Sequence, residues 1–169
     1  MLTHNLVSEV QQVALVVRDL KSTLQEYTEK LGIGPWKVMI CEPPKLTGTR
    51  IRGNPVAFTM KIAFAWTGTT MWEIIEPISG PSIYEEFLDN HGEGLHHLLI
   101  NHEDSDFTTM LSTLSERGCP PLMEGCLNGV DFAYIESESS LKTTLEVVNF
   151  PSGYTPPPPD YWYPEEPAN

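Results

Sequence analysis

The stretch QVALVVRD at residues 12–19 predicts a β-strand that leads directly into a helix. Its apolar, β-branched run is typical of a strand, and Asp19 is a residue type that caps helix N-termini. The stretch HLLINHED at residues 97–104 has the same layout, from a polar residue to an aspartate seven positions later. We therefore expect Asp104 to cap a second helix. The chain therefore contains an internal repeat. A repeat is stronger evidence for the fold than the pattern of any single segment.

Each copy of the repeat begins a similar series of elements, with hydrophobic periodicity of strand or helix type and Gly or Pro at the ends. A short helix with the capping pattern Ser82-x-x-Glu85 links the two series. The loop expected at 42–55 contains three prolines and two glycines. The order β-α-β-β-β, repeated twice, predicts an α+β fold. The expected strands are 10–17, 37–41, 56–66, 70–76, 95–101, 122–125 (weak), 130–136 and 143–148, and the expected helices are 19–31, 82–90 and 104–117.

Composition excludes several function classes. The 169 residues include 23 acidic and 10 Lys or Arg side chains, for a formal net charge of −13. Such a charge repels nucleic acids and anionic membranes, so we expect neither as a partner. No apolar run reaches the length of a membrane span, and MLTHNLVSEV at the N-terminus has no secretory signal pattern. Three cysteines without CxxC spacing predict free, buried thiols. We expect a cytoplasmic protein of one domain.

The last part of the chain has a different composition. Seven prolines lie between Pro151 and Pro167, which excludes a helix or a central strand and favours an extended polyproline conformation. The same segment contains four aromatic residues, Tyr154, Tyr161, Trp162 and Tyr163. Disordered tails contain few aromatic residues. The tail at 151–169 is therefore expected to dock on the body of the protein or on a partner.

Four segments of this sequence resemble the vicinal oxygen chelate superfamily, which includes glyoxalases, bleomycin resistance proteins and dioxygenases. The resemblance is closest to the methylmalonyl-CoA epimerase-like and glyoxalase I-like branches. It implies two tandem βαβββ modules, about 8–80 and 92–150, that form a cupped mixed sheet around a metal site within a domain of residues 1–150. The segments are QQVALVVRDLKSTLQEYTEKLGIGPW (11–36), MWEIIEP (71–77), GEGLHHLLI (92–100) and TLEVVNF (144–150).

The resemblance also implies a ligand set, because each module of this family supplies one metal ligand from its first strand and one from its last. The matching positions are Gln12, Glu73, His97 and Glu146. Strand alternation agrees with this assignment: if Gln12 faces the cup, its apolar neighbours face the helix layer. A carboxylate within an apolar strand is costly unless it is paired or metal-bound. Amide, imidazole and carboxylate donors suit one divalent ion of Zn, Ni, Co, Mn or Mg.

The other histidines are expected to be structural or surface residues. His96 should point away from the cup, since it adjoins His97 on the same strand. His91 and His102 have no matching ligand position.

The implied function is that of a metal-dependent isomerase, epimerase or lyase acting on a small carbonyl substrate through a metal-stabilised enolate. Glu146 is expected to act as general base, with Glu73 as the second catalytic carboxylate. Val16 and Pro77 stand where glyoxalase I enzymes have the residues that handle glutathione. Residues 54–59 lack the second glutamate of the epimerases. Relatives are commonly dimers, so we expect a homodimer.

Two other functions remain open. A non-catalytic binding or resistance protein would use the cup as an aromatic pocket, lined by Trp36, Trp66, Met71 and Trp72. A ring-cleaving dioxygenase needs two histidines and one carboxylate, and only His97 and Glu146 fit that pattern. In any of these readings, the basic residues of the 42–55 loop, which are Lys45, Arg50 and Arg52, could bind a substrate carboxylate.

Overall fold

The computed structural model of the chain describes residues 5–101 and 106–167. Its strands form one mixed sheet in the order β11-β2-β5-β6-β1-β7-β10-β9-β8-β3-β4. The strands are β1 (Glu9–Val16), β2 (Trp36–Cys41), β3 (Leu46–Ile51), β4 (Asn54–Pro55), β5 (Thr59–Thr67), β6 (Thr70–Ser79), β7 (Gly94–Asn101), β8 (Pro121–Leu127), β9 (Val130–Ile135), β10 (Thr144–Asn149) and β11 (Tyr161–Tyr163), and the helices are α1 (Leu20–Leu31), α2 (Ile83–His91), α3 (Phe107–Glu116) and α4 (Glu138–Leu141).

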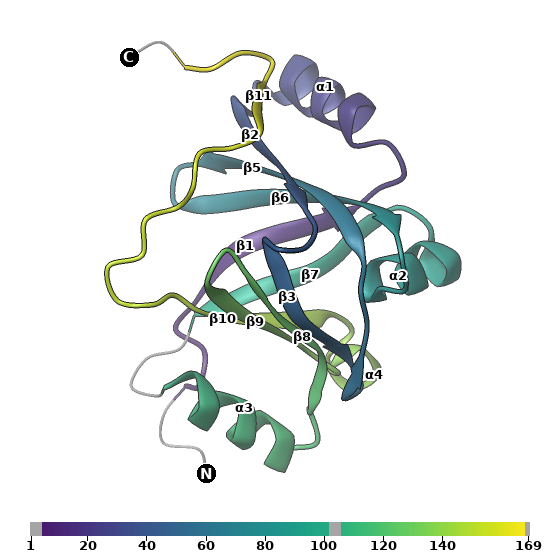
Figure 1. The fold of residues 1–169 in the computed structure, drawn as a ribbon, viewed down its shortest axis with the longest axis vertical. Coiled ribbons are helices and arrows are strands. Elements are labelled where there is room, and N and C mark those ends of the chain that lie inside the picture. Colours follow the sequence, from purple (N-terminus) through teal and green to yellow (C-terminus); the bar gives the residue numbers. More distant parts are fainter. Residues whose placement is uncertain (1–4, 102–105, 168–169) are drawn as a thin grey trace.

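The centre of the sheet has a repeated topology. The series β2-β5-β6-β1 of the first half is mirrored by β8-β9-β10-β7 of the second, and the halves meet where β1 and β7 pair antiparallel. In each half the first strand also pairs with the last in parallel, β1 with β6 and β7 with β10. Figure 1 shows the sheet between α1 at one end of the molecule and α3 at the other. The predicted α+β fold is confirmed.

The first helix forms where the sequence predicts it. Asp19 accepts a hydrogen bond from the backbone N of Ser22 at 2.9 Å, and Gly32 ends α1 with a left-handed φ of 67°. Leu20 and Leu24 of the helix are buried against the outer face of the sheet, together with Val17. This packing leaves the opposite, concave face of β1 for Gln12.

Helix α3 begins later than predicted. Asp106, not Asp104, is the N-cap of α3, and its carboxylate accepts a hydrogen bond from the backbone N of Thr109 at 3.0 Å. A helix that begins at Phe107 buries Met110 and Leu114 against the second half of the sheet. Asp104 and Asp106 are both of the type that caps helices, and the structure has Asp106 in that position, two residues later than predicted. Asp104 and His102 lie outside the described residues.

The prediction of a loop at 42–55 is wrong. This segment forms β3 and β4, and β3 pairs antiparallel with β8 of the other half. The local sequence is rich in Pro and Gly, so only the distant partner strand reveals the pairing. The same pairing extends the weakly predicted strand at 122–125 to Pro121–Leu127. It also covers the edge of β8, while β11 covers the edge of β2 at the far side of the sheet.

The proline-rich tail docks on the body of the same chain. It leaves β10, runs along one side of the molecule and ends at β11 beside β2 (Figure 1). Asp160 anchors it: its carboxylate accepts hydrogen bonds from the backbone N of Ile40 at 2.8 Å and from Lys45 Nζ at 2.8 Å. Tyr163 packs against the core cluster under α1. The tail therefore joins the end of the second half to the outer strand of the first.

The three cysteines are free, as predicted, but only Cys41 is buried. Burial, together with the charge of Glu73, raises the pKa of the Cys41 thiol to about 12, so this side chain is an unreactive core residue. Within the described residues, no helix has the length and apolar character needed to cross a membrane.

Candidate metal centre

Four side chains converge on the concave face of the sheet, where the two halves meet. Glu73 Oε2 and Glu146 Oε2 lie 3.2 and 3.3 Å from His97 Nε2. Gln12 Nε2 donates to Glu73 Oε2 at 2.8 Å and lies 3.3 Å from His97 Nε2. These are the four residues that the sequence analysis brings forward, and the structure places them in one buried cluster.

Strand register explains the convergence. Ala14 of β1 is paired with Glu73 of β6 on one side and with His97 of β7 on the other. Gln12 is two residues before Ala14, so both side chains point to the same face. Ala14 is fully buried, and its methyl group leaves room for the longer side chains around it. Glu146 of β10 enters from the neighbouring strand, because β10 pairs with β7 in parallel.

The cluster requires a positive charge. Burial would lower the pKa of His97, but hydrogen bonds to Glu146 and Glu73, with the charges of both, raise it to about 9. Burial raises the pKa of Glu73, and His97 and Gln12 counteract this effect. Two buried carboxylates therefore hold a cation between them, which is either a protonated His97 or a metal ion.

The donor set fits a divalent ion. Glu73, His97 and Glu146 each offer a ligand atom, and these atoms all lie within 4.8 Å of one another. The two carboxylates match the charge of a dication, and the amide of Gln12 can present its oxygen by a half-turn. None of the four is a thiol, which favours hard or borderline metals.

The prediction that His96 points away from the cup is wrong. The register shift between Ala14 and Leu15 leaves His96 as the extra residue of a β-bulge, and its ring contacts Tyr84 and Tyr134 on the same face as His97.

Nδ1 of His96 is 2.8 Å from Nδ1 of His97. Burial, followed by the charge of His97, lowers the pKa of His96 well below its usual value. We therefore infer that the Nδ1–H of His97 donates a hydrogen bond to Nδ1 of neutral His96. This leaves Nε2 of His97 directed at Glu73 and Glu146.

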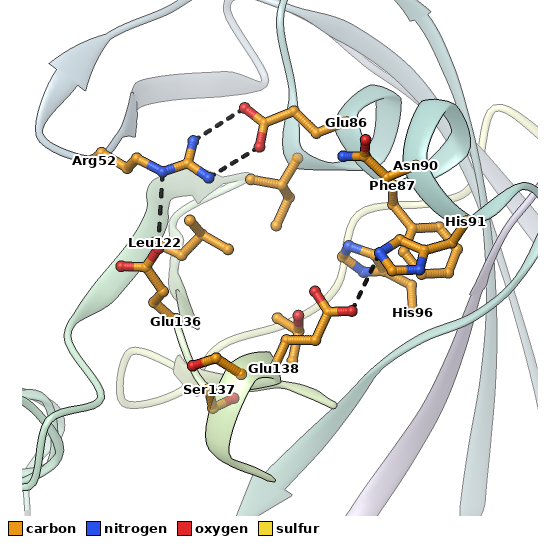
Figure 2. Close-up of a pocket in the computed structure, with 13 residues that line it drawn as sticks. Arg52, Glu86, Phe87, Asn90, His91, His96, Leu122, Glu136, Ser137 and Glu138 are labelled. Carbon is orange, nitrogen blue, oxygen red and sulfur yellow. Dashed lines mark hydrogen bonds and ion pairs between the residues drawn. The ribbon is translucent and has the colours of Figure 1, made fainter. Parts of the chain in front are cut away.

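A separate cavity of about 290 Å³ has His96 in its lining. Figure 2 shows that Arg52 is paired with both Glu86 and Glu136 at its wall and that His91 is paired with Glu138. Arg52 binds both oxygens of Glu86 at 3.0 Å. Its charge is thus already matched within the protein.

The predicted carboxylate grip of the 42–55 segment does not form at the cluster. Arg52 is engaged in the separate cavity, Lys45 is paired with Asp160, and Arg50 donates to the backbone oxygen of Gly53. The reason is the pairing of β3 with β8, which spreads these residues along the outer edge of the sheet.

The cluster opens into a second cavity of about 340 Å³, with Gln12, Glu73 and Glu146 in its floor. Its walls are mainly apolar. Of the four residues expected to line an aromatic pocket, Trp66 and Met71 do so. Trp36 is fully buried under α1, and Trp72 faces the same core on the outer side of the sheet.

The sequence analysis does not single out Lys37, which lines this cavity. The signal is present in the alternation of β2: Trp36 and Val38 are buried on the outer face, so Lys37 must face the cup. The tail is the other unforeseen part of the wall, since Phe150, Tyr154 and Pro156 line the same cavity.

Comparison with known families agrees with this architecture. Residues 11–134 match the family described as the Glyoxalase/Bleomycin resistance protein/Dioxygenase superfamily. The chain belongs to this superfamily. No curated protein sequence matches the chain.

Several solved structures share the fold of this chain at low sequence identity. A hypothetical protein from Bacillus halodurans C-125 is 19% identical, with a TM-score of 0.61 over 88% of this chain and 98% of its own. Methylmalonyl-CoA epimerase from Mycobacterium tuberculosis is 18% identical, with a TM-score of 0.58 over 88% and 91%. A mutant 4-hydroxymandelate synthase from Streptomyces coelicolor is 14% identical, with a TM-score of 0.58 over 92% of this chain and 41% of its own. At such identities the likeness establishes the fold alone.

Replacing His97 with Ala tests the electrostatics of the cluster. In metal-free protein the substitution leaves two buried carboxylates without their cation, so it should lower the free energy of unfolding by about 3–5 kcal/mol. His91→Ala is the matched control, because the exposed His91–Glu138 pair should contribute less than about 1 kcal/mol. Urea denaturation in the presence of a chelator measures both. Equal losses for the two variants would contradict the interpretation.

Proposed function

We propose that this protein is a metal-dependent isomerase, epimerase or lyase that acts on a small carbonyl compound. The supporting observation is the position of the Glu73–His97–Glu146 cluster at the floor of a mainly apolar cavity. Buried polar clusters that serve only stability have no need of an open cavity above them. Perturbed titratable groups at the base of a pocket are typical of catalytic sites.

In this proposal the metal ligands are Gln12, Glu73, His97 and Glu146, and the ion is Zn, Ni, Co, Mn or Mg. When bound, a divalent ion supplies a Lewis acid that stabilises negative charge on a carbonyl oxygen of the substrate. His97 is held in the ligating tautomer by its contact with His96. Tyr134 supports the same ring, with a distance of 4.8 Å between ring centroids.

The protein residues then move the proton. Glu146 lines the cavity, so its carboxylate reaches a substrate carbon that carries an acidic hydrogen. We assign it the role of general base, and Glu73 the role of the second carboxylate that receives or returns a proton. The apolar walls exclude water, which strengthens these interactions. A positioned general base of this kind contributes about 10²–10⁴-fold to the rate.

A second candidate function is a non-catalytic binding protein. The observation that favours it is the apolar wall that includes Trp66 and Met71, which suits the capture of a hydrophobic compound. A binder of this kind needs no proton transfer. The experiment with Glu146 below separates the two functions.

The metal is tested first. We expect one divalent ion per chain in protein purified without chelator, measured by elemental analysis. His97→Ala should abolish binding, since it removes the only imidazole ligand, whereas His91→Ala should bind like the wild type. Protein that lacks metal and also fails to bind Zn²⁺, Ni²⁺ and Co²⁺ would refute the metal site.

Proton transfer is tested with Glu146→Gln, which keeps the side-chain shape and an oxygen donor but removes the base. The wild type should exchange hydrogen for deuterium next to the carbonyl of ketones in D₂O, followed by NMR. The variant should retain most of its metal and lose about 10²–10⁴-fold in exchange rate. Glu116→Gln, an exposed site on α3, is the control. Full activity of Glu146→Gln, or no exchange by the wild type, would favour the binding function.

We also propose a homodimer. The outer strands of the two halves, β2 and β8, are already paired with β11 and β3. The strands left at the edges of the sheet, β11 and β4, have only three and two residues, so we expect the dimer to form through side-chain faces. Large apolar side chains remain about half exposed, among them Val10 at 45% and Leu95 at 55%. We expect the mass of two chains by light scattering at micromolar concentration. A monodisperse monomer would contradict this proposal.

A further inference from the structure

The cavity above the cluster has a polar floor and apolar walls. Its floor contains Gln12, Glu73 and Glu146, and its walls are aromatic and aliphatic, with Phe64 and Phe132 among them. Among the described residues that line it, Lys37 is the only basic one. A ligand for this space therefore needs an apolar body, with polar groups at few and separate places.

Strand register fixes the separation between the backbones of Lys37 and Glu73. Lys37 is paired with Phe64 on the neighbouring strand, and Phe64 with Glu73 on the next. All three side chains line the cavity, so Lys37 and Glu73 share one face two strands apart. With about 4.8 Å between strands, their backbones are about 10 Å apart.

The ammonium of Lys37 has no anionic partner within residues 5–101 and 106–167. Its Nζ lies 5.4 Å from the ring centroid of Trp66 and 5.5 Å from that of Trp162. Two indole faces hold the charge in place without neutralising it. The other basic residues nearby differ, since Lys45 is paired with Asp160 and Lys61 with Glu76.

The tail forms the remaining wall. Phe150, Tyr154 and Pro156, Pro157 and Pro159 line the cavity, and the anchor at Asp160 holds this segment against β2. The tail thus limits the space to a ligand that fits within about 340 Å³, at the small end of the range for ligand pockets.

We propose that the cup binds a small, free keto acid with an apolar body, whose carbonyl oxygen is at the floor and whose carboxylate is at Lys37. This inference rests on the proposed function, because it names the substrate class of the same site. The separation between Lys37 and the floor requires a few carbon atoms between the two oxygen groups.

The same features disfavour a CoA thioester. Phosphate groups require several cations, and Lys37 is the single basic side chain in the described lining. A thioester of the same acid would also replace the carboxylate that Lys37 binds with an uncharged group. Its long arm would have to leave the cavity past the anchored tail.

The probe for this inference is 3-benzoylpropionate, a ketone joined to a carboxylate by two methylene groups. Its methyl ester and its CoA thioester serve as matched ligands without the free carboxylate. Binding to zinc-treated protein is followed by quenching of tryptophan fluorescence, since Trp66 lines the cavity, and by calorimetry. We expect the acid to bind at least about tenfold more tightly than either derivative.

The test variant is Lys37→Met, which keeps the aliphatic stem. It should weaken binding of the acid about tenfold and leave the affinity for the methyl ester unchanged. Lys21→Met removes the same charge from an exposed position on α1 and should bind all three ligands like the wild type. Equal affinity of the wild type for acid and ester, or tighter binding of the thioester, would overturn the inference.

A tail variant tests the enclosure independently. Asp160→Ala removes the anchor, so the acid should dissociate several-fold faster in stopped-flow experiments, whereas Asp89→Ala, exposed on α2, should not change the rate. An unchanged rate for Asp160→Ala would refute the enclosing role of the tail.

The experiments distinguish failure of the proposed function from failure of the proposed ligand class. If metal analysis finds no ion but the acid still binds through Lys37, the metal-dependent function is wrong and the ligand class stands. If the metal binds and the Lys37 dependence is absent, the ligand class is wrong and the proposed function stands.

Discussion

Two carboxylates, Glu73 and Glu146, are buried against one imidazole at the line where the halves of the sheet meet. Buried like charges repel, and each carries a large desolvation cost. A cation between them offsets this cost. Against the effect of burial, hydrogen bonds to the two carboxylates, together with their charges, raise the pKa of His97 to about 9, which favours a proton in that place in the metal-free protein. The sheet buries these charged groups, and the cavity above them leaves them accessible from one side.

The sheet provides the enclosure. Side chains two apart on a strand share a face. Leu15 of β1 and Trp72 and Ile74 of β6 pack on the outer face, so Gln12 and Glu73 point inward. The small residue Ala14 between Glu73 and His97 then leaves the space in which the cluster assembles. The bulge at His96 brings a second imidazole beside His97 on the same face, and their contact orients the His97 ring. The site is therefore a property of strand register more than of any loop.

The same logic explains how much the sequence predicts. The repeat and the periodicity of the segments predict the fold class and the first helix. The set Gln12, Glu73, His97 and Glu146 follows from the family resemblance, and strand alternation agrees with it. The pairing of β3 with β8 and of β11 with β2 depends on residues far apart in the chain, which periodicity does not record. The start of α3 at Asp106 does not follow from capping chemistry, since Asp104 is the same residue type. Lys37 could have been found from the alternation of β2, but its role depends on the tail that encloses it.

The two unforeseen pairings bear on function because they close the cup. β3 brings the first half of the chain onto the outer strand of the second half, and β11 brings the end of the second half onto the outer strand of the first. Lys45 and Asp160, one beside each of these strands, are joined by an ion pair at 2.8 Å. The two halves are thus held together at the central seam and again at the outer edges. A cup joined at both places encloses an apolar cavity above a buried charge. This enclosure favours a compact ligand, in agreement with the substrate class proposed above.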